Sequence, residues 1–408
     1  MPDTDAGRAG PLPSEHMSVP TALQRTVGAL LLASGLVTGC SHAANQPTEP
    51  TSSTGAAPTK TMDAAAPTAP PCDPQALLGV LTPRQKLAQL LMVGVKDTAD
   101  AKAAIADDQV GGIFIGSWTD LSILDDLPSL QAASGALPLA VSVDEEGGRV
   151  SRLKQKIGKQ DSPRVLAQTK TADEVRGIAA ERGHKMRDLG ITIDFAPDTD
   201  VTDEPEDEVI GDRSFGSTPD KVTEYAGAYA QGLREAGLTP VLKHFPGHGH
   251  GSGDSHTGGV VTPPLESLQN IDLVPYRTLT TQTPVAVMVG HLQVPGLTVG
   301  DEPASLSKPA YDLLRSGGYG GPGFDGVVFT DDLTGMAAIS AHYGVADAAV
   351  KAMEAGADVA LWVTTDGIAE VLDKLEAAVK SGELPQAQVD KSVLRVAAMK
   401  GPSPKCVK

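Results

Sequence analysis

Eight short apolar runs, each followed by a polar or helix-forming stretch, constrain this sequence more than any other feature. The runs are Leu91–Val95, Val110–Ile115, Leu139–Val143, Ile191–Ala196, Pro240–Leu242 with its neighbours, Val285–Val289, Val327–Phe329 and Val359–Val363. Most of them lack the alternation of a half-exposed strand, which indicates strands that are buried on both faces. Strands that alternate with helices favour a parallel sheet. Eight such units over roughly 330 residues predict an α/β fold, a (β/α)8 TIM barrel, with a doubly wound sheet as the alternative.

Helix start and stop signals lie between these runs. Thr82–Gln85 and Thr171–Glu174 each place a threonine three residues before a Gln or Glu, which is the pattern of a capping box. Thr218 before a proline predicts a further helix start. Residues 346–355 are typical of a helix that ends at Gly356.

The position of the polar residues separates the two candidate folds. A barrel gathers polar side chains after the carboxyl ends of many strands, whereas a doubly wound sheet concentrates them at one switch point. Here they follow the third to seventh runs, at residues 144–149, 197–200, 243–249, 290–291 and 331–332. This distribution favours the barrel.

The N-terminal segment has the pattern of an export signal. Leu30–Val37 is apolar and follows Arg25, but it is too short to span a bilayer as a helix. Small residues lead from it to Cys40 and resemble the bacterial lipobox, which implies cleavage before Cys40 and a lipid on its sulfur. We therefore expect residues 1–39 to be a lipoprotein signal peptide, with Met17 as an alternative start. The alternative is an ordinary secretory signal with an incidental cysteine.

The chain after the signal divides into a linker and a folded domain. Residues 40–71 are mostly Ala, Pro, Thr and Ser, and such a composition predicts a disordered linker. We expect residues 72–408 to form a single folded domain. Cys72 and Cys406 lie near the ends of this domain, and an exported compartment permits disulfides. Our hypothesis is that they pair, and two free thiols are the alternative.

Charge and composition exclude some classes of partner. Lys+Arg 33 minus Asp+Glu 51 gives a net charge of −18, and aromatic residues make up 3% of the chain. A strongly acidic chain is repelled by phosphate backbones, and few aromatics leave little base-stacking surface. We therefore expect no nucleic-acid partner.

A histidine-rich window offers three interpretations. Four of the nine histidines lie between residues 244 and 256, among several glycines. His248 and His250 with Asp254 or His256 have residue types that ligate zinc. The glycines alternatively suggest a phosphate-binding loop. In the third interpretation the window is a mobile catalytic loop in which Asp254 orients the imidazole of His256 for proton transfer.

Two adjacent carboxylates, Asp331 and Asp332, end the seventh run. Buried carboxylates are costly unless they are solvated or functional. Neighbouring residues of a strand point to opposite sides, so only one of the two faces the barrel mouth. The pattern does not say which one. The alternative is that both cap the following helix, with Asp332 the better candidate.

Several longer motifs resemble a known family. Residues 243–249, Lys-His-Phe-Pro-Gly-His-Gly, followed by Asp-Ser-His at 254–256, resemble the signature of glycoside hydrolase family 3 in its β-N-acetylhexosaminidase, NagZ-like branch. Residues 144–152 resemble that branch's Asp-Gln-Glu-Gly-Gly-Arg-Val-Gln-Arg, with Glu145 and Ser151 in place of the glutamines. Residues 194–197, 210–215 and 329–333 also match, and the resemblance covers most of residues 80–400.

The resemblance implies roles for individual residues. Asp331 resembles the family's catalytic nucleophile, and His256 with Asp254 resembles the acid/base pair. The positions that match sugar contacts are Asp144, Arg152, Arg213, Lys243 and His244. His291 is a candidate wall residue of the site. Neither a metal nor another cofactor is implied.

The resemblance also implies an activity and a location. The expected reaction is retaining hydrolysis of terminal β-linked N-acetylglucosamine from peptidoglycan fragments or muropeptides. The alternatives are a β-glucosidase or a phosphorylase of the same family, or a non-catalytic lipid-anchored sugar-binding protein. We expect a monomer that a lipid anchor holds on the outer face of the cell membrane.

Overall fold

The computed structural model describes residues 74–401 of the 408-residue chain. The expected signal peptide, the linker, Cys40, Cys72 and Cys406 lie outside the described residues. Within residues 74–401, no helix is both long enough and apolar enough to cross a bilayer.

Eight parallel strands form the central sheet, in the order β11-β9-β7-β6-β3-β2-β1-β12. They are β1 (Leu91–Gly94), β2 (Gly112–Ile115), β3 (Ala140–Val143), β6 (Ile193–Asp194), β7 (Thr239–Phe245), β9 (Ala286–Val289), β11 (Val328–Thr330) and β12 (Ala360–Trp362). A bridge between Phe329 and Val359 joins β11 to β12, so the sheet returns on itself as a barrel. All eight predicted runs are therefore strands, and the TIM-barrel prediction is confirmed over the doubly wound alternative.

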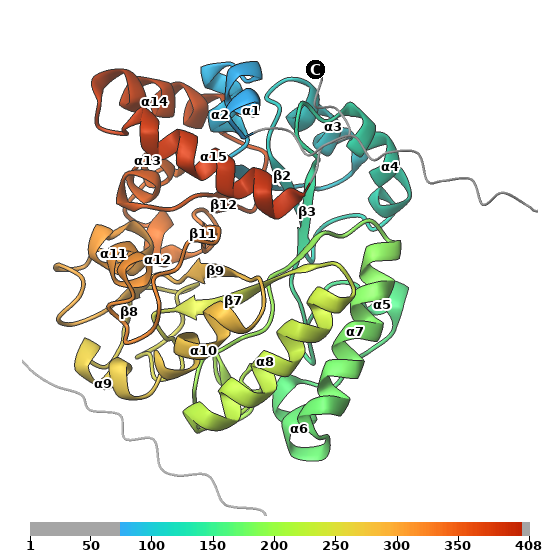
Figure 1. Ribbon diagram of the computed structural model, residues 1–408, viewed down its shortest axis with the longest axis vertical. Coiled ribbons are helices and arrows are strands. Elements are labelled where there is room, and N and C mark those ends of the chain that lie inside the picture. The colour runs from blue at the N-terminus through green and yellow to red at the C-terminus, as the bar shows by residue number, and fades with distance from the viewer. Residues whose placement is uncertain (1–73, 402–408) are drawn as a thin grey trace, which may run out of the picture. The chain divides into compact units, whose positions relative to one another are not determined.

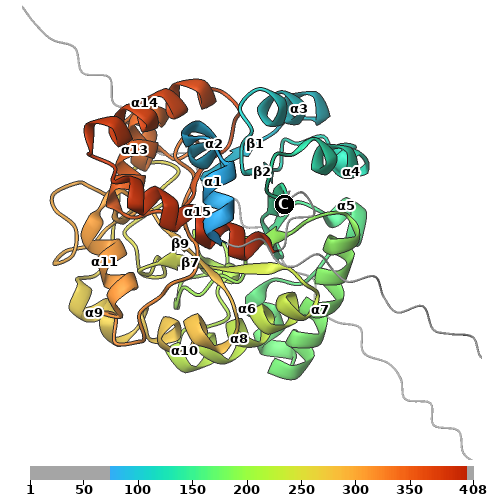
Figure 2. The ribbon, with the colours of Figure 1, turned by 45° about the horizontal axis from the view of Figure 1, so that its top comes forward.

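Helices surround the strands, as Figures 1 and 2 show. They are α1 (Pro74–Val80), α2 (Pro83–Ala88), α3 (Thr98–Ala106), α4 (Ile123–Ala133), α5 (Lys154–Ile157), α6 (Pro163–Thr169), α7 (Ala172–Asp188), α8 (Pro219–Glu235), α9 (Leu265–Asn270), α10 (Val274–Gln282), α11 (Lys308–Ser316), α12 (Ala337–Ser340), α13 (Val345–Ala355), α14 (Ile368–Ser381) and α15 (Gln386–Lys400). The predicted capping boxes are present at Thr82 and Thr171, and Thr218 caps α8. The helix predicted at 346–355 is α13, which ends at Gly356.

Two short ribbons and two 3-10 turns complete the description of residues 74–401. The strands β4 (Glu145–Gly147) and β5 (Val150–Ser151) pair antiparallel, and β8 (Val260–Val261) and β10 (Leu292–Gln293) pair parallel. The 3-10 turns lie at Gly211–Arg213 and Ala304–Leu306. These elements belong to the connections that follow barrel strands.

Three phenylalanines meet inside the barrel and settle which way Asp331 points. The ring of Phe195 lies 5.7 Å from that of Phe114 and 5.5 Å from that of Phe329. These residues come from β2, the end of β6 and β11, which are not neighbours in the sheet, so the rings meet across the interior. Asp331 is two residues beyond Phe329 and shares its side. Asp331 therefore faces the barrel mouth, and Asp332 points away from it.

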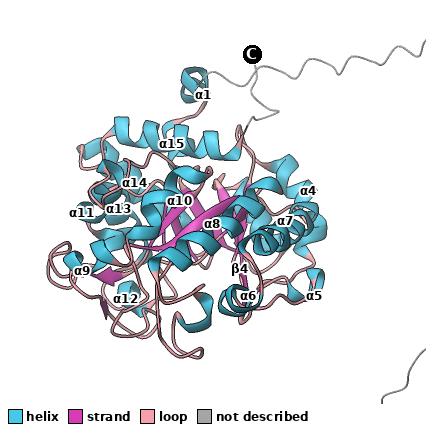
Figure 3. Cartoon of the chain, turned by 60° about the horizontal axis from the view of Figure 1, so that its bottom comes forward, coloured by secondary structure: helices cyan, strands magenta, loops and turns pink. Residues whose placement is uncertain are grey.

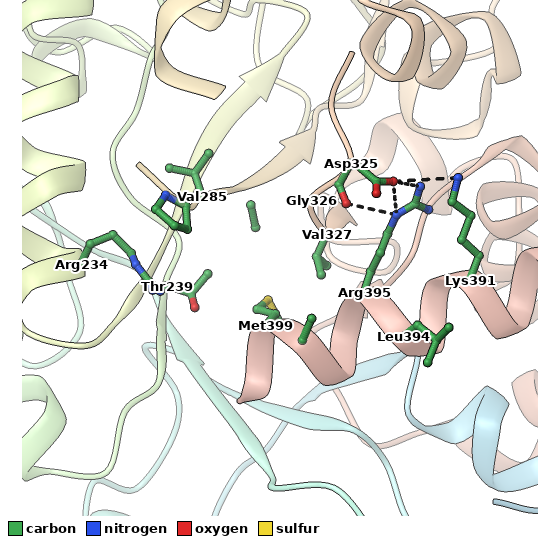
Figure 4. A pocket seen from close by; sticks show the side chains of 13 residues that line it. Arg234, Thr239, Val285, Asp325, Gly326, Val327, Lys391, Leu394, Arg395 and Met399 are labelled. Carbon is green, nitrogen blue, oxygen red and sulfur yellow. Dashed lines mark hydrogen bonds and ion pairs between the residues drawn. The ribbon is translucent and has the colours of Figure 1, made fainter. Parts of the chain in front are cut away.

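The two ends of the barrel differ. Figure 3 shows α15 and α1 at one end, whereas α6, α12 and long loops gather at the other. A hollow of about 520 Å³ lies at the α15 end, between Thr239, Val285 and Val327 at the strand beginnings and Arg395 and Met399 of α15. Figure 4 shows the side chains that line it. None of the predicted catalytic or sugar-contacting residues lines this hollow. Lys243 and His244 lie in the last part of β7, and the others lie in the connections that follow barrel strands.

Candidate active site

Asp331 lies directly after β11 and is only 8% exposed. Its Oδ1 accepts a hydrogen bond of 2.9 Å from the amide of Asp332. Burial alone would raise the pKa of Asp331, but the charges of His291, His244 and Lys243, together with that amide, outweigh it and hold the pKa below its ordinary value. The carboxylate is therefore ionised at neutral pH.

The side chain of His291 lines this pocket and carries no charge at neutral pH. Its Nε2 lies 2.7 Å from the carbonyl oxygen of Asp332, and its Nδ1 lies 2.7 Å from the hydroxyl of Ser305. A carbonyl can only accept, so Nε2 carries the proton and the Ser305 hydroxyl donates to Nδ1. Burial lowers the pKa of His291. At neutral pH, the positive charge that stabilises ionised Asp331 therefore comes from Lys243 rather than from His291.

The carboxylate of Asp332 is used in hydrogen bonds that hold the following turn. Its Oδ1 accepts from the amide of Thr334 at 2.9 Å and from the hydroxyl of Thr334 at 3.0 Å, and its Oδ2 accepts from the amide of Gly335 at 2.7 Å. The helix-capping alternative is wrong in detail, because Asp332 holds the turn at 333–335, whereas α12 begins only at Ala337.

Lys243 and Glu146 form the centre of a polar cradle at the barrel mouth. Lys243 Nζ donates to Asp144 Oδ1 at 2.7 Å and lies 2.6 Å from Glu146 Oε1. Arg213 donates from Nε and Nη2 to the two oxygens of Glu146, each at 2.8 Å. The structure thus brings Asp144, Lys243 and Arg213 together, as expected for groups that contact one ligand.

Charge pairing stabilises the ionised forms inside this cradle. Burial alone would raise the pKa of Glu146, but Arg213 and Lys243 hold it far below its usual range. Burial alone would lower the pKa of Lys243, but Asp144 and Glu146 raise it above the ordinary value. The cradle therefore presents fixed charges rather than groups that titrate near neutral pH.

Arg152 is the loosest of the predicted sugar contacts. Its Nη2 lies 4.0 Å from Asp144 Oδ2, at the limit of an ion pair, and its Nε is buried without a hydrogen-bond partner. The guanidinium therefore has donor capacity that no protein group uses.

A buried carboxylate that sequence reasoning did not single out positions His244. Asp200 Oδ2 lies 2.7 Å from His244 Nδ1, and its Oδ1 accepts from the amides of His244 at 3.3 Å and His248 at 2.7 Å. Burial alone would raise the pKa of Asp200, but the two histidines lower it. With Asp200 ionised, Nδ1 of His244 carries a proton and its Nε2 points toward Arg213 Nη2 at 3.5 Å.

The residues that sequence reasoning missed all lie in segments that the sequence had already marked as candidates for the site. Glu146 lies inside the 144–152 motif, and Asp198 and Asp200 follow β6 at the mouth. Their location was visible in the sequence, but their partners were not. Asp198 Oδ2 is buried without a hydrogen-bond partner, 3.6 Å from Arg213 Nη2. Burial and the charge of Asp200 raise the pKa of Asp198 well above its ordinary value.

His256 and Asp254 form the predicted pair on the loop after β7. His256 Nδ1 lies 2.7 Å from Asp254 Oδ1, and the same oxygen accepts from the amide of His256 at 2.9 Å. The side chain of His256 is 60% exposed. Burial alone would raise the pKa of Asp254, but the two bonds to His256 lower it. The ionised carboxylate therefore keeps a proton on Nδ1, and Nε2 remains for proton exchange.

The side chains that the zinc interpretation named do not come together as a set of metal ligands. His250 lies 3.7 Å from Asp272 and 3.9 Å from Asp203, whereas His248 packs against His244 with ring centroids 5.8 Å apart. Within residues 74–401, the group of side chains close enough to hold an ion is instead Asp198, Asp200 and His244. The guanidinium of Arg213 already lies against that group.

The two departures from the family motif lie together. Ser151 Oγ donates to Glu145 Oε1 at 2.5 Å, and Glu145 also accepts from the amide of Leu153 at 2.6 Å and from Arg182 of α7. Glu145 and Glu146 are neighbours on β4 with separate partner sets. Glu145 thus joins β4, β5 and α7, while Glu146 serves the cradle.

Comparison with known proteins gives consistent findings. The Glycosyl hydrolase family 3 N terminal domain matches residues 82–399. The chain is 61% identical over 389 residues to beta-hexosaminidase LpqI of Mycobacterium tuberculosis, covering 94% of this chain and 99% of that protein. The solved structure of M. tuberculosis LpqI matches with a TM-score of 0.81 and 65% identity, over 82% of this chain and 98% of that one. A family 3 beta-N-acetylglucosaminidase structure from Paenibacillus matches with a TM-score of 0.73 and 36% identity, over 78% and 62% of the two chains.

Proposed function

Because this chain belongs to glycosyl hydrolase family 3, we propose that it is a retaining exo-β-N-acetylglucosaminidase that acts on peptidoglycan fragments or muropeptides. The observation that carries the proposal is the ionised carboxylate of Asp331, which faces the barrel mouth beside a cradle of fixed charges. A separate imidazole–carboxylate pair lies on the loop after β7. Nucleophile and proton carrier are thus distinct groups, as retaining hydrolysis requires.

The first step forms a glycosyl–enzyme ester. A carboxylate oxygen of Asp331 attacks the anomeric carbon as the bond to the leaving oxygen breaks, and the electron pair goes to that oxygen. Protonated His256 donates its Nε2 proton there, which avoids release of an alkoxide. Asp254 stabilises the protonated ring before transfer and fixes its orientation afterwards.

The second step returns the enzyme to its starting state. Neutral His256 takes a proton from water as the water oxygen attacks the anomeric carbon. The ester bond to Asp331 breaks, and the carboxylate leaves with the electron pair. Two inversions at one carbon give net retention. An imidazole suits both steps because its ordinary pKa lies near neutral pH.

The cradle residues supply positioning for the cleaved sugar. Asp144 accepts from sugar hydroxyls, and Lys243, Arg213 and Arg152 donate to hydroxyl or N-acetyl oxygens. Ion pairs hold Lys243 and Arg213 before any ligand arrives. Prior placement of these groups reduces the entropy lost when the sugar is oriented for attack.

The test combines trapping with substrate choice. A 2-deoxy-2-fluoro glycosyl donor is expected to label Asp331, identified by peptide mass, and Asp331→Asn is expected to abolish turnover of 4-nitrophenyl N-acetyl-β-glucosaminide with folding intact. Label on another residue, or full activity of Asp331→Asn, would refute the assignment. Preference for the matching glucoside would favour the β-glucosidase alternative. Turnover that rises with phosphate and yields a sugar 1-phosphate would favour phosphorolysis.

We also propose that the protein is exported, lipidated on Cys40 and held as a monomer on the outer face of the membrane. Support comes from the lipobox-like residues before Cys40 and from the composition of 40–71. In a lipidating bacterial host, labelled palmitate should enter the unaltered protein and be lost in Cys40→Ser. Label that persists in Cys40→Ser argues against this site. The proposed pairing of Cys72 with Cys406 fails if two free thiols are counted on folded, non-reduced protein.

A further inference from the structure

Trp118 is an exposed aromatic residue beside the barrel mouth that the mechanism above does not use. It lies three residues beyond the end of β2 and is 45% exposed. The chain has two tryptophans, and the other one, Trp362, is fully buried. Large exposed aromatic rings at the rim of a site commonly mark ligand contacts.

Strand geometry places the Trp118 ring over the barrel interior. Phe114 points inward, and Gly116, the residue directly after β2 and two beyond Phe114, continues the alternation and points to the same side. A Cβ on Gly116 would overlap the six-membered ring of Trp118. The ring therefore occupies the inward side above Phe114, with ring centroids 5.9 Å apart.

The same register sets Trp118 beside the polar cradle. Phe114 pairs with Ser142 and Ile115 with Val143, so Gly116 continues alongside Asp144. Partner residues of parallel strands face the same side, so Asp144 also points inward. The indole thus lies next to a cradle residue, but it is far more open to solvent than the 8% exposed Asp331.

A hydrogen-bonded turn holds the ring in place. Thr119 Oγ1 donates to the carbonyl of Val95 at 2.6 Å and accepts from the amide of Gly116 at 3.0 Å. The amide of Asp120 donates to the carbonyl of Lys96 at 2.8 Å. Trp118 is thus anchored to the end of β1, and a ligand that stacks on it need not first order the loop.

We propose that the exposed face of Trp118 is the platform for the aglycone sugar, the residue that leaves when the glycosidic bond is cut. This inference rests on the proposed function. The cleaved sugar occupies the inner position against Asp331, where polar partners suit its hydroxyls. The next pyranose extends outward, where the apolar face of its ring stacks on the indole. The ligand class is therefore a β-linked amino-sugar pyranose rather than an arbitrary leaving group.

The test compares a substrate that has an aglycone sugar with one that has none. In Trp118→Ala, kcat/KM for the β-1,4-linked N-acetylglucosamine disaccharide should fall at least about fivefold. Turnover of N-acetylglucosaminyl fluoride, whose leaving group cannot reach the platform, should stay within about twofold. Trp118→Phe should lie between, and Val80→Ala on α1, an exposed apolar residue at the opposite end of the barrel, should change neither.

A binding measurement gives an independent readout. In the Asp331→Asn background, the disaccharide should shift tryptophan fluorescence to the blue and protect it from acrylamide, because Trp362 is already buried. Trp118→Phe should remove this response, and N-acetylglucosamine alone should produce little of it. Equal losses for both substrates, an unchanged disaccharide rate, or a response that survives Trp118→Phe would each overturn the proposal. If the unaltered protein cleaves neither substrate, the proposed function itself is wrong and this inference falls with it.

Discussion

Replacement of Glu146 by Gln tests whether the cradle is held by charge. The carboxylate of Glu146 is 1% exposed and contacts Arg213 twice at 2.8 Å and Lys243 at 2.6 Å. Glutamine keeps the size of the side chain but loses its charge. It also turns one acceptor oxygen into an NH2 group that faces a cation.

The expected loss of stability follows from the contacts that remain. Breaking a buried ion pair by removing one partner costs about 3–5 kcal/mol. Lys243 keeps Asp144 at 2.7 Å, and Arg213 keeps Asp198 at 3.6 Å. We therefore expect the lower end, about 3 kcal/mol, in the free energy of unfolding measured by urea denaturation at pH 7.

Activity should fall as well, because both cations lose their orientation. A misplacement of about 1 Å in positioning groups costs about a hundredfold. We expect a loss of that order in kcat/KM for 4-nitrophenyl N-acetyl-β-glucosaminide.

Glu145→Gln is the matched control for this experiment. Glu145 is an adjacent buried carboxylate whose partners are Arg182, Ser151 and the amide of Leu153. It should lose similar stability but keep kcat/KM within about threefold, since Glu145 and these partners make no hydrogen bond or ion pair to the side chains of Glu146, Lys243 or Arg213. Glu146→Gln with unaltered stability and kinetics, or an equal kinetic loss in both variants, would refute the reasoning.

Three further predictions concern the neighbouring groups. Asp332→Asn should lower the free energy of unfolding by about 1–2 kcal/mol, since one of its acceptor oxygens becomes a donor. It should cost far less activity than Asp331→Asn. A larger kinetic loss in Asp332→Asn than in Asp331→Asn would exchange the roles assigned to the two residues. His256→Ala should slow substrates with poor leaving groups more than activated aryl glycosides, and equal losses across a leaving-group series would make the residue structural. Dialysis against a chelator should leave turnover unchanged, whereas a loss restored by zinc would place a required ion at Asp198, Asp200 and His244.

The fold was accessible from sequence because a barrel requires a repeated local pattern. Each barrel strand is buried on both faces and must be apolar over several residues, so each of the eight strands left a readable run. The capping residues Thr82 and Thr171 act within one helical turn, and local pattern sufficed for them as well. The family motifs then located the carboxylates and histidines of the mouth.

The partners of these residues depended on contacts between distant segments. Sequence could not say whether Asp331 or Asp332 faces inward, because that depends on rings from β2 and β6 that meet Phe329 across the barrel. Nor could it assign Glu146 to Arg213, because they lie 67 residues apart in the chain. The inward position of Trp118 likewise depends on the register of β2 with β3 and on the close approach of its ring to Gly116.

The order of amino acids along the chain therefore determined which segments become strands and which residue types collect at the carboxyl ends of those strands. Only the closed barrel decided which of those residues touch, because pairing across the mouth depends on strand register and the direction of each side chain. Everything proposed for catalysis needs both: the apolar repeats that build the barrel, and the closure that brings charges from several loops around one carboxylate.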